Sequence, residues 1–301
     1  NLVGAAGSIA PGLVENETWA LAYDKIANPF IGILSGIIGG TVYNRFRHTK
    51  LPDMLAFFSG KRSVAIVTGL VSIAVSAILL LVWPVVFGTL VAIGNGVKRL
   101  GAMGAGIYAF LNRLLIPTGL HHLVYMPFQF SQLGGQLTVG SVTYTGAYVV
   151  MMTEYNLNLP FSDGIVWMYT GFTKTFGYFG IAAAFIFCAR RGSRRKTAAQ
   201  LLPLAFTASL ASVTEPMDFL FCFSAPVLWL AHAAISGAFI VLLHLCHVTA
   251  FTSNLLGSLA MNLSAGAART HYPVLYLLGL AQIAVYFVVF TALIKALDLP
   301  T

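Results

Sequence analysis

The chain of 301 residues is 58% hydrophobic and only 9% charged, and its mean hydropathy is +0.83. Soluble domains carry about 25% charged residues, so this composition excludes an ordinary water-soluble protein and predicts an integral membrane protein in contact with lipid. A net charge of +8 could indicate nucleic-acid binding. However, the basic residues cluster between apolar runs, which favours a role in membrane orientation and predicts no nucleic-acid partner.

The chain begins at Asn1, inside a run of small residues and without a methionine. It lacks the pattern of a signal peptide, in which a basic flank precedes a short apolar core and a cleavage site. We therefore expect an N-terminally truncated chain.

Long apolar runs predict the membrane helices, because a helix needs about 20 apolar residues to cross a bilayer. An interior helix is expected at 100–117, which carries an arginine among small residues. Membrane helices are predicted at 27–44, 63–87, 164–189, 223–248 and 273–296. Lys and Arg are commonest on the cytoplasmic side, so the basic loops at 45–62 and 190–196 should both face the cytosol. Lys98 and Arg99 are expected to reach an interface.

Two stretches do not have the pattern of a simple span. Residues 118–162 are rich in glycine, and residues 201–226 carry Glu215 and Asp218 in the middle of apolar sequence. Irregular backbone at membrane depth is tolerated only where it is buried in protein or lines a cavity. Both stretches are therefore predicted to be re-entrant hairpins that bring polar groups to a central site.

Ionisable residues inside apolar segments indicate a functional site, because a charge in a membrane costs a few kcal/mol or more. Arg113 and His121 are separated by a proline and a glycine, so they can face one cavity if the chain turns there. Glu215 stands directly before Pro216, where backbone amides are free. Arginine, histidine and glutamate together offer donors, acceptors and a base to a neutral polyhydroxyl ligand, with no metal ion needed.

Structural roles compete with these functional ones. Glu215 could cap the start of a helix. His232, His244 and His247 lie in one apolar run, where a neutral core histidine is more common than a ligand, and the HxxH spacing lacks a nearby acid. We expect no metal and no other cofactor. Apolar surroundings without CxxC spacing predict buried free thiols at Cys188, Cys222 and Cys246.

Three motifs carry a resemblance to a known family. They are LPDMLAFFSGKRSVAIVTGL at 51–70, RLLIPTGLHHLVYMPF at 113–128 and SVTEPMDFLFCFSAPVLWLAH at 212–232. In this order they resemble the motifs of enzyme IIC permeases of the bacterial phosphotransferase system, in the glucose superfamily. The resemblance extends from Ala27 to Leu297. GLHHLVYMPF followed by QLGG looks most like the maltose and α-glucoside branch, and glucose and N-acetylglucosamine permeases share GLHH and TEP.

The resemblance implies a multi-pass, all-α protein of the bacterial inner membrane, a homodimer of ten-helix subunits with two re-entrant hairpins. Residues 1–87 would be an incomplete dimer-contact domain, with its cytosolic loop at 45–62. Residues 88–100 would be an amphipathic linker, and residues 101–301 would form the sugar-binding domain. By this resemblance, the chain would depart from the family pattern in lacking the first two helices, and it has Thr118 where phenylalanine is usual.

The family also implies roles for individual residues. Arg113, His121 and Glu215 match the sugar-contacting arginine, the GLHH histidine and the TEP glutamate, and His122 and Thr214 belong to the same motifs. All five are expected to bind the sugar. Glu215 and His121 are the expected catalytic residues: Glu215 orients or deprotonates the sugar 6-hydroxyl, and His121 binds ring hydroxyls or balances charge. Arg113 would hold the sugar or stabilise the phosphoryl charge.

The implied partner is a phosphorylated IIB protein or domain, which would present a phosphocysteine from the cytosol. The chain would then be the membrane subunit of a protein-phosphocysteine–sugar phosphotransferase. None of its own cysteines stands in the CxTRLR context of a IIB phosphorylation site. Lys61 and Arg62 in FFSGKR suit the docking of such a phosphoprotein, although they could serve only as a topology signal.

Two other classes of function are weighed against this one. A secondary sugar transporter could use the buried Glu215 to carry protons. A purely structural membrane protein is poorly supported, because charge within the membrane would serve no purpose in it.

Overall fold

The computed structural model describes residues 19, 22–23, 26, 29–50 and 52–299. Helices make up most of this part of the chain, and the sheet within it is one two-stranded hairpin, so the predicted all-α class is confirmed. The chain divides into two compact units, Asn1–Ile93 and Gly94–Thr301. The roles predicted for segments 1–87, 88–100 and 101–301 stay predictions.

Unit one contains a helical pair joined by a short loop. Its elements are α3 (Pro29–Phe46), the 3₁₀ helix η2 (Asp53–Phe58) and most of α4 (Lys61–Arg99). Gly60 closes the loop with a φ of 65°, and its backbone N–H donates to the Thr49 carbonyl at 2.9 Å. The helix predicted at 63–87 is present, and residues 88–99 continue it without a break.

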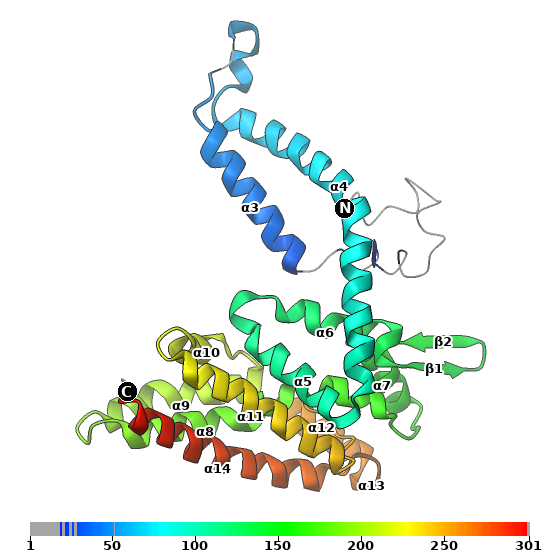
Figure 1. Cartoon of the computed structure of the whole chain (residues 1–301), viewed down its shortest axis with the longest axis vertical. Helices are drawn as coiled ribbons and strands as arrows, with labels where there is room; N and C mark the ends of the chain where they lie inside the picture. The colour runs from blue at the N-terminus through cyan, green and yellow to red at the C-terminus, as the bar shows by residue number, and fades with distance from the viewer. Residues whose placement is uncertain (1–18, 20–21, 24–25, 27–28, 51, 300–301) are drawn as a thin grey trace. The chain divides into compact units, whose positions relative to one another are not determined.

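Unit two holds the remaining elements, which are shown in Figure 1. Its first half comprises α5 (Gly101–Leu114), η3 (Ile116–Thr118), α6 (His121–Phe130), η4 (Gln132–Gly134), β1 (Gln136–Val139), β2 (Val142–Thr145) and α7 (Ala147–Asn156). Its second half comprises η5 (Asp163–Gly171), α8 (Phe172–Cys188), α9 (Arg194–Ala211), α10 (Glu215–Cys222), α11 (Pro226–Leu245), α12 (Leu255–Ala265), α13 (Ala267–Thr270) and α14 (Tyr272–Ala296).

Four helical stretches in the described residues are long and apolar enough to cross a membrane: Lys61–Arg99, Asp163–Cys188, Pro226–Leu245 and Tyr272–Ala296. They correspond to four of the predicted spans. The span predicted at 27–44 matches α3, with residues 27 and 28 outside the described part. This helix is not among the four, because its glycines and polar last turn make it less apolar.

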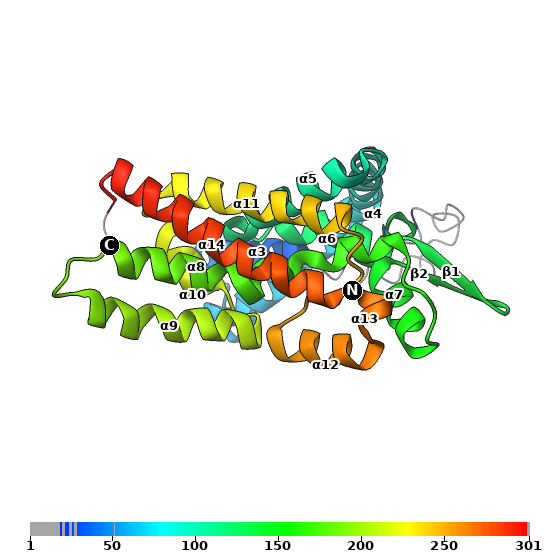
Figure 2. The same ribbon diagram turned by 90° about the horizontal axis from the view of Figure 1, so that it is seen from below.

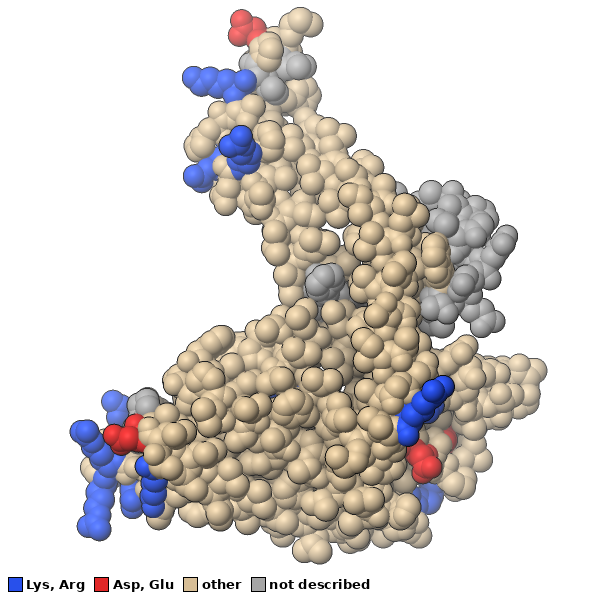
Figure 3. Space-filling model, in the orientation of Figure 1, with Lys and Arg blue, Asp and Glu red and all other residues tan. Residues whose placement is uncertain are grey.

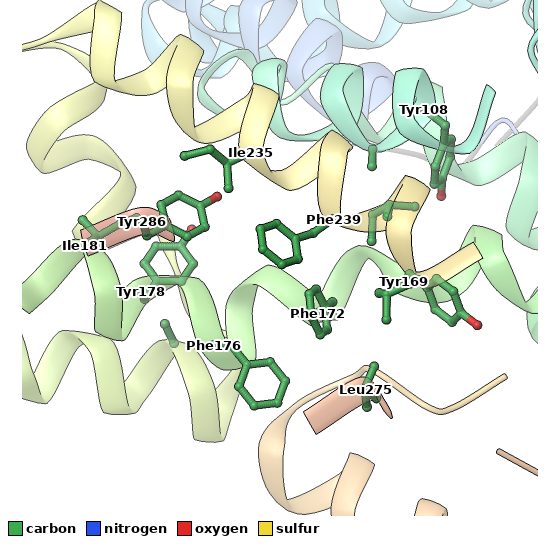
Figure 4. Packing of buried hydrophobic residues seen from close by; sticks show 14 of the residues in the cluster. Tyr108, Tyr169, Phe172, Phe176, Tyr178, Ile181, Ile235, Phe239, Leu275 and Tyr286 are labelled. Atoms are coloured by element: carbon green, nitrogen blue, oxygen red, sulfur yellow. The ribbon is translucent and has the colours of Figure 1, made fainter. Parts of the chain in front are cut away.

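Long helices of unit two pack side by side around its core. In Figure 2, α11, α14, α8 and α9 run beside one another, and α8 packs against both α9 and α14. Large rings fill the space between α5, α8, α11 and α14, as Figure 4 shows for Tyr108, Phe172, Tyr178, Phe239 and Tyr286. Because lipid is as apolar as these rings, close van der Waals packing between the helices stabilises this core.

Glycines allow α5 and α11 to approach closely. A Cβ added at Gly237 would lie 2.8 Å from the Gly106 carbonyl oxygen, and one added at Gly106 would lie 3.2 Å from the Gly237 carbonyl oxygen. Small residues at such crossings are typical of helix pairs in membranes. The Trp229 indole N–H donates to the Leu114 carbonyl at 3.1 Å and fixes α11 against the end of α5.

The two stretches expected to be irregular are both broken. Residues 118–162 contain α6, the β-hairpin and α7, and residues 201–226 contain the end of α9, a short turn and α10. The hairpin pairs Val139 with Val142 across Gly140, which has a φ of 62°. This hairpin was not predicted.

The basic cluster at 190–196 differs from the predicted loop. Only its first part is a turn, because α9 begins at Arg194 and takes Arg195 and Lys196 into its first turn. Arg194 reaches back to α8, where it donates from Nη2 to the Phe187 carbonyl at 2.8 Å and from Nε to the Ala189 carbonyl at 3.2 Å. This contact satisfies carbonyls that the end of α8 leaves free.

Charged side chains are sparse on the surface. In Figure 3, the charged residues of unit two gather in small groups toward two ends of its viewed face, and the surface between these groups is coloured as uncharged. Within unit two, Lys98 in the last turn of α4 is exposed, yet its ammonium donates to the Leu133 carbonyl at 3.1 Å. The cation is therefore held by the protein's own backbone.

The three cysteines are free, but they are less buried than predicted. Cys188 and Cys222 are partly exposed and Cys246 is exposed. The reason is their position: each lies at the C-terminal end of a helix, α8, α10 or α11, where the chain turns at the surface of the described protein.

Candidate functional site

A sharp turn after α5 forms one wall of the site. The 3₁₀ helix η3 ends at Gly119, whose φ of 72° lies in the left-handed region that a residue without a Cβ adopts readily. The chain then enters α6 at His121. The turn between Arg113 and His121 that the sequence required is present, and both residues border the same cavity.

A second break, before α10, forms another wall. Ser212 ends α9 with a φ of 60°, Thr214 is the N-cap of α10, and Glu215 and Pro216 are its first two residues. Thr214 is buried and Glu215 is exposed. In the described residues neither side chain makes a capping hydrogen bond, so the alternative in which Glu215 caps the helix gains no support.

The cavity between these walls has a volume of about 380 Å³. All five residues predicted to bind a sugar line it: Arg113, His121, His122, Thr214 and Glu215. They come from α5, α6 and the start of α10, so the fold brings together two motifs that are far apart in the sequence. Their chemical roles stay predictions.

The two histidines lie against each other on the first turn of α6. Their ring centroids are 4.1 Å apart, and His122 Nδ1 is 2.6 Å from the Tyr125 hydroxyl. His121 Nδ1 is buried without a hydrogen-bond partner in the described protein. Burial, reinforced by nearby His122, Lys174 and Arg113, lowers the pKa of His121 to about 4. A neutral His121 offers one donor and one acceptor to a ligand.

Arg113 is almost fully buried, with only 4% of its surface exposed. Nη1 donates to the Tyr178 hydroxyl and Nη2 donates to the Thr170 carbonyl, each at 3.3 Å. Tyr178 in turn donates to Asp218. The guanidinium group is therefore held from behind by α8 and η5 and reaches the cavity from the end of α5.

Sequence reasoning missed several polar residues of the site. Lys174 on α8 lines the cavity, together with Asn112 and Gln129. Lys174 could have been found, because it is an ionisable residue inside an apolar span. Asn112 and Gln129 carry no such signal, since a single amide side chain at a helix end is common on protein surfaces.

Lys61 and Arg62, the predicted docking pair, lie in unit one. Lys61 is exposed. The guanidinium of Arg62 stacks 4.3 Å from the centroid of the Phe57 ring, and Nη1 donates to the Phe57 carbonyl at 3.1 Å. Both side chains are exposed, but Arg62 is engaged within the loop.

The remaining histidines are dispersed. His232 is completely buried, whereas His247 is exposed at a turn with a φ of 50°. Within the described chain, no three His, Cys, Asp or Glu residues are grouped closely enough to hold a metal ion.

Apolar helices long enough to cross a membrane, together with a polar cavity of ligand size, are typical of a polytopic helical membrane protein. The family model described as "Phosphotransferase system, EIIC" matches residues 2–237. The chain belongs to this family. It is accordingly a multi-pass protein of the bacterial inner membrane and an EIIC component of a phosphotransferase system.

Similar proteins of known specificity span several sugars. The N-acetylglucosamine-specific EIICB component of Bacillus subtilis is 34% identical over 99% of this chain and 63% of its own length. The N-acetylglucosamine-specific EIICBA component of Escherichia coli is 37% identical over 90% of this chain and 41% of its own. The maltose-specific EIICB component of B. subtilis is 31% identical over 86% of this chain and 50% of its own length. The chain thus spans about half the length of these relatives.

Proposed function

We propose that this chain binds a sugar in the cavity bounded by Arg113, His121 and Glu215 and carries the sugar across the membrane. A phosphorylated IIB protein or domain transfers its phosphoryl group to the sugar during this transport. One observation supports this most: a single cavity of about 380 Å³ gathers all five residues that sequence reasoning assigned to a sugar. Its volume is in the range of pockets that hold small ligands. Its charged and amide side chains match the hydroxyls of a sugar.

The proposed reaction is a direct phosphoryl transfer. The 6-hydroxyl oxygen of the sugar attacks the phosphorus of a phosphocysteine on IIB, an O–P bond forms, and the S–P bond breaks to release a thiolate. Glu215 orients the hydroxyl and accepts its proton. Neutral His121 binds ring hydroxyls, and Arg113 holds the sugar by donating hydrogen bonds to another of its hydroxyls.

The proposed substrate is an α-glucoside, maltose included, on the strength of the GLHHLVYMPF and QLGG segments. The alternatives are N-acetylglucosamine and glucose, because relatives named for N-acetylglucosamine and for α-glucosides resemble the chain to a similar degree. A thermal-shift series with maltose, methyl α-glucoside, glucose and N-acetylglucosamine separates them, since a ligand at 100 times its Kd stabilises the folded state by about 2.7 kcal/mol.

The proposed partners are a IIB protein or domain and a second copy of the chain in a homodimer. IIB is supported by the names of the relatives, which designate EIICB and EIICBA components. The homodimer rests on the family resemblance and is tested by the mass of the purified protein in detergent.

The central test replaces Glu215 by glutamine, which keeps the shape but removes the charge and most of the basicity. If Glu215 only bound a hydroxyl, sugar affinity alone would fall, by about 1.5–3 kcal/mol. We expect phosphotransfer to fall by a further factor of about 100 or more, because a proton acceptor is lost. Sugar affinity is measured by calorimetry, and the rate of phosphotransfer from phospho-IIB is measured on the same protein.

The matched controls are His121→Gln, which should mainly weaken binding, and Asp163→Asn, which removes an exposed carboxylate that does not line the cavity. Near-normal affinity and turnover in Glu215→Gln would show that the proposed active site is wrong.

A second candidate function is proton-coupled transport without phosphorylation. It is favoured by one observation: Glu215 is exposed at the cavity and makes no hydrogen bond or ion pair within the described chain. Vesicles that accumulate unmodified sugar in response to a pH gradient, in the absence of phospho-IIB, would support this function over the first.

A further inference from the structure

A second carboxylate lies behind the cavity. Asp218 follows Glu215 by one turn of α10, but it is 0% exposed and does not line the cavity. Its Oδ1 accepts a hydrogen bond of 2.5 Å from the hydroxyl of Tyr178, which is also 0% exposed. The same hydroxyl accepts a hydrogen bond from Nη1 of Arg113 at 3.3 Å. One tyrosine oxygen therefore connects the buried carboxylate to the arginine at the cavity.

The chemistry of these groups fixes the direction of the chain. A guanidinium group has only donors, so Tyr178 must accept from Arg113 and can give its single proton only to Asp218. A buried carboxylate is costly unless it is paired and hydrogen-bonded. Among the groups that hydrogen bonds connect to Asp218, Arg113 is the cation.

Other titratable groups near Asp218 do not replace Arg113. Nε2 of His232 lies 4.0 Å from Asp218 Oδ1, but neither ring nitrogen of His232 has a hydrogen-bond partner in the described protein. Its ring is enclosed by aromatic rings, including those of Tyr178, Trp229 and Tyr286. Lys174 and Glu215, which also face this region, line the cavity itself.

We propose that Asp218 is the positioning residue for Arg113: through the Tyr178 hydroxyl, it supplies the negative charge that holds the guanidinium group at the edge of the cavity. This inference rests on the proposed function, because the ligand that Arg113 contacts is taken to be a sugar. Tyr178 and the Thr170 carbonyl occupy two of the five N–H donors of Arg113. The other donors stay available to the ligand.

The arrangement links α5, α8 and α10 to one arginine. Both of its anchoring bonds are long, at 3.3 Å, so the charge of Asp218 matters more than the bonds alone. A polarised hydroxyl between a cation and an anion strengthens both hydrogen bonds. Loss of either the charge or the hydroxyl should therefore free Arg113 without altering any residue that lines the cavity.

The test uses the full chain with Asp218→Asn, Tyr178→Phe and Arg113→Gln, and measures binding of methyl α-glucoside and its 2-, 3-, 4- and 6-deoxy analogues. N-acetylglucosamine and its deoxy analogues replace them if the unmodified protein binds only that sugar. Each analogue lacks one hydroxyl, so the series reports which hydroxyl each side chain contacts. If a side chain contacts a given hydroxyl, the variant that lacks this side chain binds the sugar with and without that hydroxyl equally well. Removal of the hydroxyl is then called silent in that variant.

We expect Asp218→Asn to weaken binding about tenfold or more and Tyr178→Phe to weaken it by about three- to tenfold. The decisive result is the pattern: the hydroxyl that becomes silent in Arg113→Gln should become silent in both other variants. It should keep its full effect in Glu215→Gln. The maximal rate of phosphotransfer at saturating sugar should change less than the Michaelis constant.

Thr173→Val is the matched control. Thr173 is buried on the same helix as Tyr178, and it hydrogen-bonds to Ser236 and Gln282 instead of Arg113. Its loss should lower thermal stability without changing the deoxy-sugar pattern. A uniform loss over all analogues in Tyr178→Phe, or a pattern like that of the unmodified protein, would overturn the inference.

Failure of the proposed function can be distinguished from failure of the role proposed for Asp218. If Asp218→Asn does not fold, Tyr178→Phe decides, because it removes one oxygen and no charge. If the unmodified protein binds no sugar, the proposed function fails. If it binds sugar through Glu215 but Tyr178→Phe leaves the pattern intact, only the role of Asp218 fails.

Discussion

Two carboxylates one helical turn apart, Glu215 and Asp218, have opposite surroundings. Glu215 is exposed at the cavity, and Asp218 is fully enclosed behind it. The proline after Glu215 starts a helix whose first turn must carry both. A short helix that begins at a cavity can therefore present one acid to a ligand and keep the other as a buried counter-charge.

The sequence allowed Glu215 to be assigned but not Asp218. Glu215 stands before a proline, which is a local signal, whereas the partner of Asp218 is Tyr178, 40 residues away in the sequence. Such a pairing depends on how α8 packs against α10, and no periodicity along either helix reports it. Arg113 and His121 could be predicted because the turn between them is marked by proline and glycine.

Sugar binding should be insensitive to pH around 6.5, the usual pKa of histidine. Burial holds the pKa of His121 at about 4, so this side chain stays neutral above about pH 5. We expect the Kd from calorimetry to stay constant from about pH 7.5 to about pH 5.5 and to rise as the pH approaches 4. A transition near 6.5 that disappears in His121→Gln would contradict this.

The same shift has a consequence for stability, and its sign is fixed. Unfolded His121 binds a proton below about pH 6.5, whereas folded His121 does not until about pH 4. The unfolded state therefore binds more protons in this window, and the contribution of His121 to stability is lost as the pH falls from about 6.5 to about 4.

At the scale of elements, close helix contacts depend on particular glycines. A Cβ added at Gly180 on α8 would lie 2.3 Å from the Ile283 carbonyl oxygen on α14. Because that atom is backbone, the two helices would have to separate. We expect Gly180→Ala to lower the free energy of unfolding in detergent by about 1–3 kcal/mol.

Gly96→Ala is the matched control for this prediction. An added Cβ at Gly96, on α4, meets nothing within 4 Å. This variant should gain up to about 1 kcal/mol, because alanine is the better helix former. Equal effects of the two substitutions on the free energy of unfolding would show that an added Cβ at Gly180 does not force α8 and α14 apart.

The loop before α4 should affect phosphotransfer more than sugar binding. Lys61 is exposed at the start of the helix, and a positive charge there can attract an acidic phosphoprotein. Lys61→Glu should lower the rate of phosphotransfer, most strongly at low ionic strength, and leave sugar affinity near normal. Lys196→Glu, in the other basic cluster, is the control. Parallel loss of binding and transfer would indicate misfolding.

Most long elements could be predicted, and the short ones could not. Apolar length alone locates α4, α8, α11 and α14. The β-hairpin has a signal that was not used, because QLTVGSVTYT is rich in β-branched residues around a glycine. By contrast, the first turn of α9 was taken for a loop, since nothing local shows that Arg194 would bind the carbonyls at the end of α8.

At the scale of the whole molecule, both basic clusters should lie on one side of the membrane, because Lys and Arg bias sets orientation. Ser59→Cys and Ser193→Cys, in a chain without its native cysteines, should not react with an impermeant reagent added to intact cells. Both should react after the cells are opened, which serves as the control. Removal of the exposed Cys246 is essential to the design. Ready labelling of either position from outside would refute the orientation.

The length of α4 has a consequence for the choice of bilayer. Its 39 residues extend about 58 Å, almost twice the hydrocarbon thickness of about 30 Å, so part of the helix lies outside the hydrocarbon even when it is tilted. A membrane helix adjusts to a change in thickness by tilting, by kinking or by reorienting the long side chains at its ends. Here Lys98 is bound to the Leu133 carbonyl, so this end keeps its depth. In thicker or thinner membranes, the adjustment should fall on the other end of the helix and on the surrounding lipid.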